Sequence, residues 1–128
     1  MTAHLYFMAR TAETTVNVKR WSLLRHFAEE LVGIARPALS VSEEFKEIAR
    51  ELYGVAEITP ATILSLCRAI AAEECENAKN TIPAVRYDSA IGYEPSMEYI
   101  GDEPYILWKL ECTEKAVEEL SEMLAPLM

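Results

Sequence analysis

Aspartate and tyrosine residues concentrate in one stretch of the chain, residues 83–108. This stretch holds both aspartates of the sequence, four of its six tyrosines, three of its six prolines and one of its two tryptophans. Flat rings beside hydrogen-bonding carboxylates are the mixture that carbohydrate sites use, because rings stack on sugars and carboxylates accept from hydroxyls. The candidate contact residues for a saccharide or a partner domain are Arg86, Tyr87, Asp88, Tyr93, Glu94, Glu98, Tyr99 and Trp108.

The same side chains also have a purely structural interpretation, which is the commoner case. The backbone polar groups of a buried loop need partners, and tyrosine hydroxyls and carboxylates supply them. A glycosidase acid and base, Asp88 with Glu94 or Glu98, would need carboxyl groups roughly 5–10 Å apart across an open cleft. One short loop gives no indication of such a cleft, so we expect no catalytic residue here.

Glutamate pairs spaced three residues apart are a second feature that could carry chemistry. Two carboxylates one turn apart share a helix face and can hold a hard divalent cation such as Mg²⁺. Because the chain has 21 acidic residues, such pairs are expected on solvated helix faces alone, and this is the favoured interpretation. The two pairs that fall on successive predicted helices are Glu44 with Glu47 and Glu73 with Glu76.

The separation of these two pairs along the sequence resembles the one found in the all-α nucleotide pyrophosphatases of the MazG type. The resemblance implies a Mg²⁺-dependent phosphohydrolase in which the four glutamates bind the metal. That family ends its second pair with aspartate, where this chain has Glu76, and it needs basic residues for the phosphates. We therefore keep this function as an alternative and otherwise expect no cofactor.

The overall charge excludes two classes of partner. The net charge is −9, the isoelectric point is near 4.7, and the 12 basic residues are scattered. Nucleic acids and anionic membrane surfaces both require clustered Lys and Arg, so we expect neither. The sequence also contains no window of about 18 apolar residues, the length that would cross a bilayer.

The cysteines and the N-terminus predict a cytoplasmic location. Three cysteines without a CxxC pattern favour buried thiols, and the N-terminus lacks a signal-peptide pattern.

Apolar residues recur at helical spacing through most of the chain. Residues 3–35 are predicted to form one long helix or two, ended by Pro37. A capping box at residues 40–43 predicts the start of a short helix, and Gly54 suits the position just past its end. The apolar face predicted for this short helix consists of Phe45, Ile48, Ala49 and Leu52.

Local signals also place two later helices. Thr59 before Pro60 predicts the start of a helix, and residues 81–83 predict its end at a proline. Asp102 can cap a last helix, which Pro126 closes. The predicted fold is all-α, a four- to five-helix bundle in a single domain (1–128), with one long ordered loop rich in Tyr and Asp at residues 83–102.

Three pieces of this sequence carry a resemblance to a known class of proteins. They are residues 77–83 (NAKNTIP), 88–99 (DSAIGYEPSMEY) and 108–110 (WKL). Together they resemble a C-terminal helical region, matched over roughly residues 73–110, of large bacterial proteins that are glycoside hydrolases or uncharacterised relatives of them. The resemblance implies a helical module that packs on, or follows, a catalytic barrel and has no catalytic residue of its own.

The favoured hypothesis is a non-catalytic helical module associated with a carbohydrate-active protein. The module would pack on a partner domain, and its 83–102 loop would meet that domain or a saccharide. The alternatives are a Mg²⁺-dependent bundle like the nucleotide pyrophosphatases, and a plain helical domain for interaction or self-association. In each case residues 1–128 form one domain, either independent or part of a larger protein.

Overall fold

The computed structural model describes residues 3–33, 43–87, 93–94, 99–100 and 102–128. Most of these residues lie in four α-helices: α1 (Ala3–Leu31), α2 (Glu43–Tyr53), α3 (Pro60–Tyr87) and α4 (Glu103–Leu124). A short 3-10 helix, η3 (Ala125–Leu127), follows α4. The prediction of an all-α bundle with four or five helices is confirmed.

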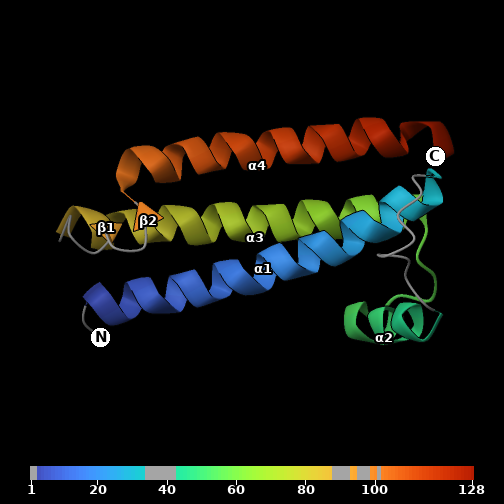
Figure 1. Cartoon of the computed structure of the whole chain (residues 1–128), viewed down its shortest axis with the longest axis horizontal. Helices are drawn as coiled ribbons and strands as arrows, with labels where there is room; N and C mark the ends of the chain where they lie inside the picture. Colours follow the sequence, from blue (N-terminus) through green and yellow to red (C-terminus); the bar gives the residue numbers. More distant parts are fainter. Residues whose placement is uncertain (1–2, 34–42, 88–92, 95–98, 101) are drawn as a thin grey trace.

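The three long helices lie side by side, with α3 in the middle (Figure 1). α1 runs along one side of α3 and α4 along the other, and α3 is antiparallel to both. α1 and α4 meet each other at few positions, because α3 separates them. The short helix α2 lies at the end of the bundle where α3 begins.

Two apolar clusters stabilise the bundle, one toward each end of α3. The small cluster joins Phe7 of α1, Ala78 and Val85 of α3, and Ile106 of α4. Burying one large aliphatic or aromatic side chain contributes about 1.5–3 kcal/mol, so both clusters matter to stability. The large cluster joins all four helices and includes Leu24, Phe27, Ala49, Ile63, Cys67, Ile70, Leu120 and Leu124.

Buried polar side chains separate the two clusters. We call this region the polar section, and its residues are Thr14 and Asn17 of α1, Glu74 and Asn77 of α3, and Lys109 of α4. Asn17, Glu74 and Asn77 are buried in the interior. A buried polar group is costly unless it is hydrogen-bonded, so the bonds within this section decide whether the helices can close over it.

The predicted helix ends are confirmed at three places. Thr59 caps α3 by accepting a hydrogen bond from the amide of Thr62, at 3.1 Å. Asp102 caps α4 by accepting from the amide of Tyr105, at 3.0 Å. Gly54 follows α2 with φ of 65°, a left-handed conformation that glycine adopts without steric cost. The capping box predicted before α2 involves residues 40–42, which lie outside the described residues.

The first helix is continuous and ends earlier than predicted. α1 covers 29 residues without a break, which resolves the choice between one helix and two. It ends at Leu31, where Gly33 takes a positive φ of 82° and its amide bonds the carbonyl of Glu30. The prediction that Pro37 ends this helix is therefore wrong, because a glycine terminates it first.

The third helix continues through the proline that was predicted to stop it. Pro83 lies inside α3, which extends to Tyr87. The last turn is held by tertiary contacts: Ala84 and Val85 are buried, and Arg86 forms two hydrogen bonds with Glu103 of α4, at 2.8 and 2.5 Å. These contacts outweigh the hydrogen bond that proline removes from the helix.

The predicted long loop is consequently shorter than residues 83–102. Residues 83–87 are helical, and two short strands, β1 (Tyr93–Glu94) and β2 (Tyr99–Ile100), pair in antiparallel register. No strand was predicted, because two-residue strands leave too little alternation to detect. Residues 88–92, 95–98 and 101 lie outside the described residues.

Candidate binding surfaces

The structure places two of the predicted contact side chains, Arg86 and Trp108. Arg86 is exposed at the end of α3, where its pairing with Glu103 raises the pKa of the guanidinium and lowers the pKa of the carboxyl. Trp108 is 55% exposed on α4, and its ring centre lies 5.3 Å from that of Tyr105. Arg86 therefore joins two helices, whereas Trp108 presents an aromatic face to solvent.

The side chains of the remaining predicted contact residues all lie outside the described part of the structure. Asp88 and Glu98 lie outside the described residues, and so do the side chains of Tyr87, Tyr93, Glu94 and Tyr99, of which the structure describes the backbone. Nothing therefore tests the pairing of Asp88 with Glu94 or Glu98, and the expectation that this stretch holds no catalytic residue stays a prediction.

The four glutamates of the alternative metal site are not gathered around one point. Glu44 and Glu47 are exposed on α2, and Glu73 and Glu76 are exposed on α3. Glu73 instead accepts a hydrogen bond from Arg20 at 3.0 Å. In the part of the chain that the structure describes, no three His, Cys, Asp or Glu side chains could jointly hold a metal ion. The geometry does not favour the phosphohydrolase.

Glu74 is the hub of the polar section. One of its carboxylate oxygens accepts from Thr14 and from the Lys109 ammonium, each at 2.5 Å, and the other accepts from Asn17 at 2.8 Å. Burial raises the pKa of Glu74, but the hydrogen bonds from Lys109, Thr14 and Asn17 outweigh it and leave the pKa below its ordinary value. Glu74 is therefore an ionised, fully engaged carboxylate that ties α3 to both neighbours.

Next to this hub, two buried polar atoms have no hydrogen-bond partner within the described residues. They are the side-chain oxygen of Asn77 and Nε of Arg10. The Asn77 amide nitrogen is engaged, since it donates to the Arg10 carbonyl at 2.8 Å and to the Thr14 hydroxyl at 3.0 Å. Unpaired buried polar atoms are uncommon in folded proteins, and they need an explanation.

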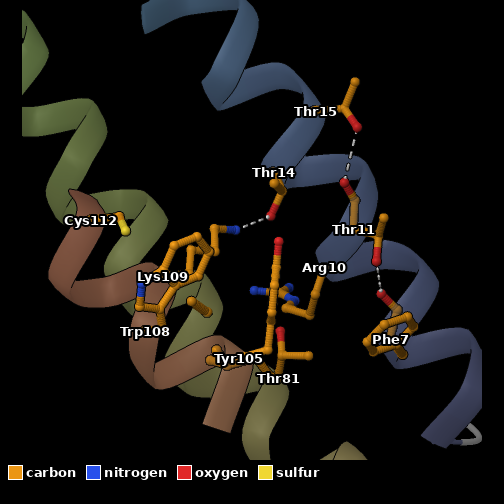
Figure 2. Close-up of a pocket in the computed structure, with 12 residues that line it drawn as sticks. Phe7, Arg10, Thr11, Thr14, Thr15, Thr81, Tyr105, Trp108, Lys109 and Cys112 are labelled. Carbon is orange, nitrogen blue, oxygen red and sulfur yellow. Dashed lines mark hydrogen bonds between the residues drawn. The ribbon is translucent and has the colours of Figure 1, made fainter. Parts of the chain in front are cut away.

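A hollow of about 380 Å³ opens beside Arg10 (Figure 2). Its walls come from the first half of α1, the second half of α3 and the start of α4. Tyr105 extends from α4 toward α1, and Arg10 reaches into the same space from the opposite wall. We call this space the α1–α4 hollow. The lining residues are Phe7, Arg10, Thr11, Thr14, Thr15, Ala78, Thr81, Tyr105, Ile106, Trp108, Lys109 and Cys112.

Sequence reasoning missed this hollow, although it left a signal. Arg10, Thr14 and Asn17 recur on α1 at intervals of four and three, the spacing of one helix face. Glu74, Asn77 and Thr81 repeat the pattern on α3. Polar residues that occupy what should be an apolar stripe on two helices indicate a shared polar interior between them.

A second surface is the outward face of α2. Of the residues predicted to form the apolar face of this helix, Ala49 is buried, but Ile48 is 59% exposed and Leu52 is 67% exposed. The side chain of Phe45 lies outside the described residues. Ile48 and Leu52, on the apolar face predicted for this helix, therefore lie at the surface and not in the core.

Tertiary contacts explain the rotation of α2. Lys46 bonds Glu30 of α1 at 3.4 Å, and the Tyr53 hydroxyl donates to the Arg20 carbonyl of α1 at 3.3 Å. Lys46, Ala49 and Tyr53 are spaced three and four residues apart, so they share one face. That face packs inward, which turns Ile48 and Leu52 toward solvent.

The cysteines only partly match the prediction of buried thiols. All three are free; Cys67 is buried, Cys75 is half-buried and Cys112 is exposed. Burial raises the pKa of the Cys67 thiol to about 12. Cys67 is therefore a structural thiol of the large cluster, and the prediction is wrong for Cys112.

Comparisons with known proteins add no relative to this description. The chain matches no protein-family model, no curated protein and no solved structure. In the described part of the chain, every helix falls short of the combination of length and apolar character that crossing a bilayer requires.

Proposed function

We propose that the chain is a non-catalytic helical module that binds a partner domain through the outward face of α2. The observation that carries this proposal is the exposure of Ile48 and Leu52, which are one turn apart on the most amphipathic helix of the chain. Covering one such side chain contributes about 1.5–3 kcal/mol, so a partner that buries both gains substantial affinity.

Charge indicates what this partner looks like. Glu44, Glu47 and Glu51 are exposed on α2 and flank the Ile48–Leu52 pair at helical spacing. A second copy of the chain would bring the same acids face to face, which disfavours self-association. The complementary surface is an apolar patch bordered by Lys and Arg.

The class of the partner follows from the resemblance of roughly residues 73–110. That resemblance implies a helical module beside the catalytic barrel of a glycoside-hydrolase-like protein. We therefore propose that the partner is such a barrel, in the same polypeptide or in another one. The predicted saccharide contact of the 83–102 stretch belongs to the same proposal.

Site-specific photocrosslinking in the source cells tests this proposal. A photoreactive amino acid replaces Leu52, and the control replaces Met8, which is also exposed but lies on α1 near the opposite end. We expect an adduct with a glycoside-hydrolase-like domain from position 52 and none from position 8. The purified partner should then bind the chain, and Leu52→Glu should weaken binding at least about tenfold, because burying an unpaired charge is unfavourable.

Three results separate the parts of the proposal. Binding that weakens as salt rises supports the basic border on the partner, because salt screens surface charges. A specific adduct with a different class of protein overturns the carbohydrate association but keeps α2 as the docking element. Adducts between copies of this chain, or equal crosslinking from both positions, overturn the docking proposal itself.

A further inference from the structure

The α1–α4 hollow combines features that the docking proposal does not use. Its volume of about 380 Å³ lies within the range of small-molecule sites, which is roughly 300–1,000 Å³. It is lined by both polar and aromatic side chains and lies away from α2 (Figures 1 and 2).

The charge of the lining contrasts with that of the chain. The whole chain carries a net charge of −9, yet the described residues that line the hollow include two cations, Arg10 and Lys109, and no carboxylate. Lys109 donates to Glu74 and to Thr14, which leaves one of its three ammonium hydrogens for a further acceptor. The lining thus offers an anion two cationic side chains, each of which keeps N–H donors beyond those that its carboxylate partner uses.

Contacts within the chain hold Arg10 in place but leave some of its N–H donors without an acceptor. One guanidinium nitrogen pairs with Glu13 at 3.2 Å, and the guanidinium lies over the ring of Tyr6, 5.2 Å from its centre. Its Nε is buried and has no partner within the described residues. The guanidinium has five N–H donors, so a bound oxygen can take donors that these contacts leave unused.

Three threonine hydroxyls supply acceptors around the hollow. Thr11, Thr15 and Thr81 each donate to a backbone carbonyl of their own helix, four residues earlier. The hydroxyl hydrogen is thereby used, and the oxygen lone pairs can accept from a ligand. These positions favour a ligand that carries hydroxyl groups.

Two aromatic rings complete the arrangement. Tyr105 and Trp108 are 45% and 55% exposed at the α4 wall, although a large aromatic ring is normally well covered. A ring face at the rim of a hollow can stack on the flat or apolar side of a ligand.

From these residues we infer that the α1–α4 hollow binds a small polyhydroxylated anion, of the size and chemistry of a sugar acid or sugar phosphate. Arg10 and Lys109 bind the carboxylate or phosphate, the threonine oxygens accept from hydroxyls, and Trp108 covers one side of the ring. This site is independent of docking through α2, and either proposal can fail without the other.

Titration of tryptophan fluorescence tests the site. Trp21→Phe leaves Trp108 as the single tryptophan, and the probes are glucuronate, glucose 6-phosphate, glucose and acetate. We expect saturable shifts with glucuronate or glucose 6-phosphate, and at least about tenfold weaker binding of glucose and acetate, because each lacks one class of contact. Tighter binding of glucuronate would indicate a sugar acid as the ligand, and tighter binding of glucose 6-phosphate would indicate a sugar phosphate.

Two variants and one control connect the binding to the named residues. Arg10→Gln should weaken binding of the anionic probe about tenfold, the usual effect of losing a charge-assisted hydrogen bond. Thr15→Val, which replaces an exposed hydroxyl, should weaken binding of the sugar probes but not of acetate. Arg68→Gln removes an exposed arginine outside the hollow and should change nothing.

The inference is overturned by two results. One is the absence of saturable binding of either anionic sugar to a chain that is folded by circular dichroism. The other is binding that Arg10→Gln and Arg68→Gln affect equally, because a surface effect of net charge would not distinguish them.

Discussion

Ile70 of the large cluster and Glu74 of the polar section are one turn apart on α3, yet they are buried for opposite reasons. Ile70 contacts apolar side chains, and its burial is favourable without any partner atom. Glu74 is buried only because Thr14, Asn17 and Lys109 each donate to it. One helix therefore carries a region that close apolar packing stabilises and a region whose burial depends on each hydrogen bond.

The largest expected effect comes from the large cluster. Leu24 is fully buried, so Leu24→Ala should lower the free energy of unfolding by about 3–5 kcal/mol, through lost burial and a cavity. Urea denaturation followed by circular dichroism measures this change. Leu5→Ala is the matched control, since Leu5 is exposed on the same helix, and a similar loss in both variants would contradict the assignment of the core.

A smaller effect is expected in the polar section. Glu74→Gln should lower the free energy of unfolding by about 1–3 kcal/mol, because the Lys109 ammonium loses its carboxylate. Lys109→Met should cost less, since Thr14 and Asn17 still donate to Glu74, and the double variant should cost less than both changes added together. Additive losses in this cycle would show that the two side chains act separately.

The two regions should also differ in their response to acid. The folded pKa of Glu74 lies below its ordinary value of 4.5, so its contribution to stability is full above that pH and is lost as the pH falls through the folded pKa. Stability should therefore fall on acidification below pH 4.5 more steeply in the natural chain than in Glu74→Gln. Leu24→Ala should show the same pH dependence as the natural chain, because it removes no titrating group.

The smallest expected effect is on the outward face of α2. Leu52→Ser should change the free energy of unfolding by less than about 0.5 kcal/mol, because Leu52 makes little contact with the bundle. Thermal denaturation of the isolated chain measures it. A loss as large as that of Leu24→Ala would place Leu52 in the core and remove the basis of the docking proposal.

The sequence predicted features that depend on neighbouring residues along the chain. The caps at Thr59 and Asp102 and the glycine after α2 need only a local hydrogen bond or a left-handed backbone. It failed where distant contacts decide. Arg86 and Glu103 are 17 residues apart, and their pairing helps α3 continue past Pro83.

The candidate sites were harder to predict for the same physical reason. The apolar pattern of α2 correctly indicates an amphipathic helix, but the contacts of Lys46 and Tyr53 with α1 determine which face turns inward. The α1–α4 hollow combines residues from three helices that are far apart in the sequence, such as Thr14 and Lys109, which are 95 positions apart. A pattern of neighbouring residues in the sequence cannot show that positions so far apart come together in space.

The free thiol of Cys112 offers a direct way to follow the α1–α4 hollow. It is exposed and lines that space, while burial raises the pKa of the thiols of Cys67 and Cys75 and so suppresses their reactive thiolates. Iodoacetamide should therefore alkylate Cys112 first. The rate of that alkylation, followed by mass spectrometry, becomes a built-in readout of whether a small molecule occupies the space beside it.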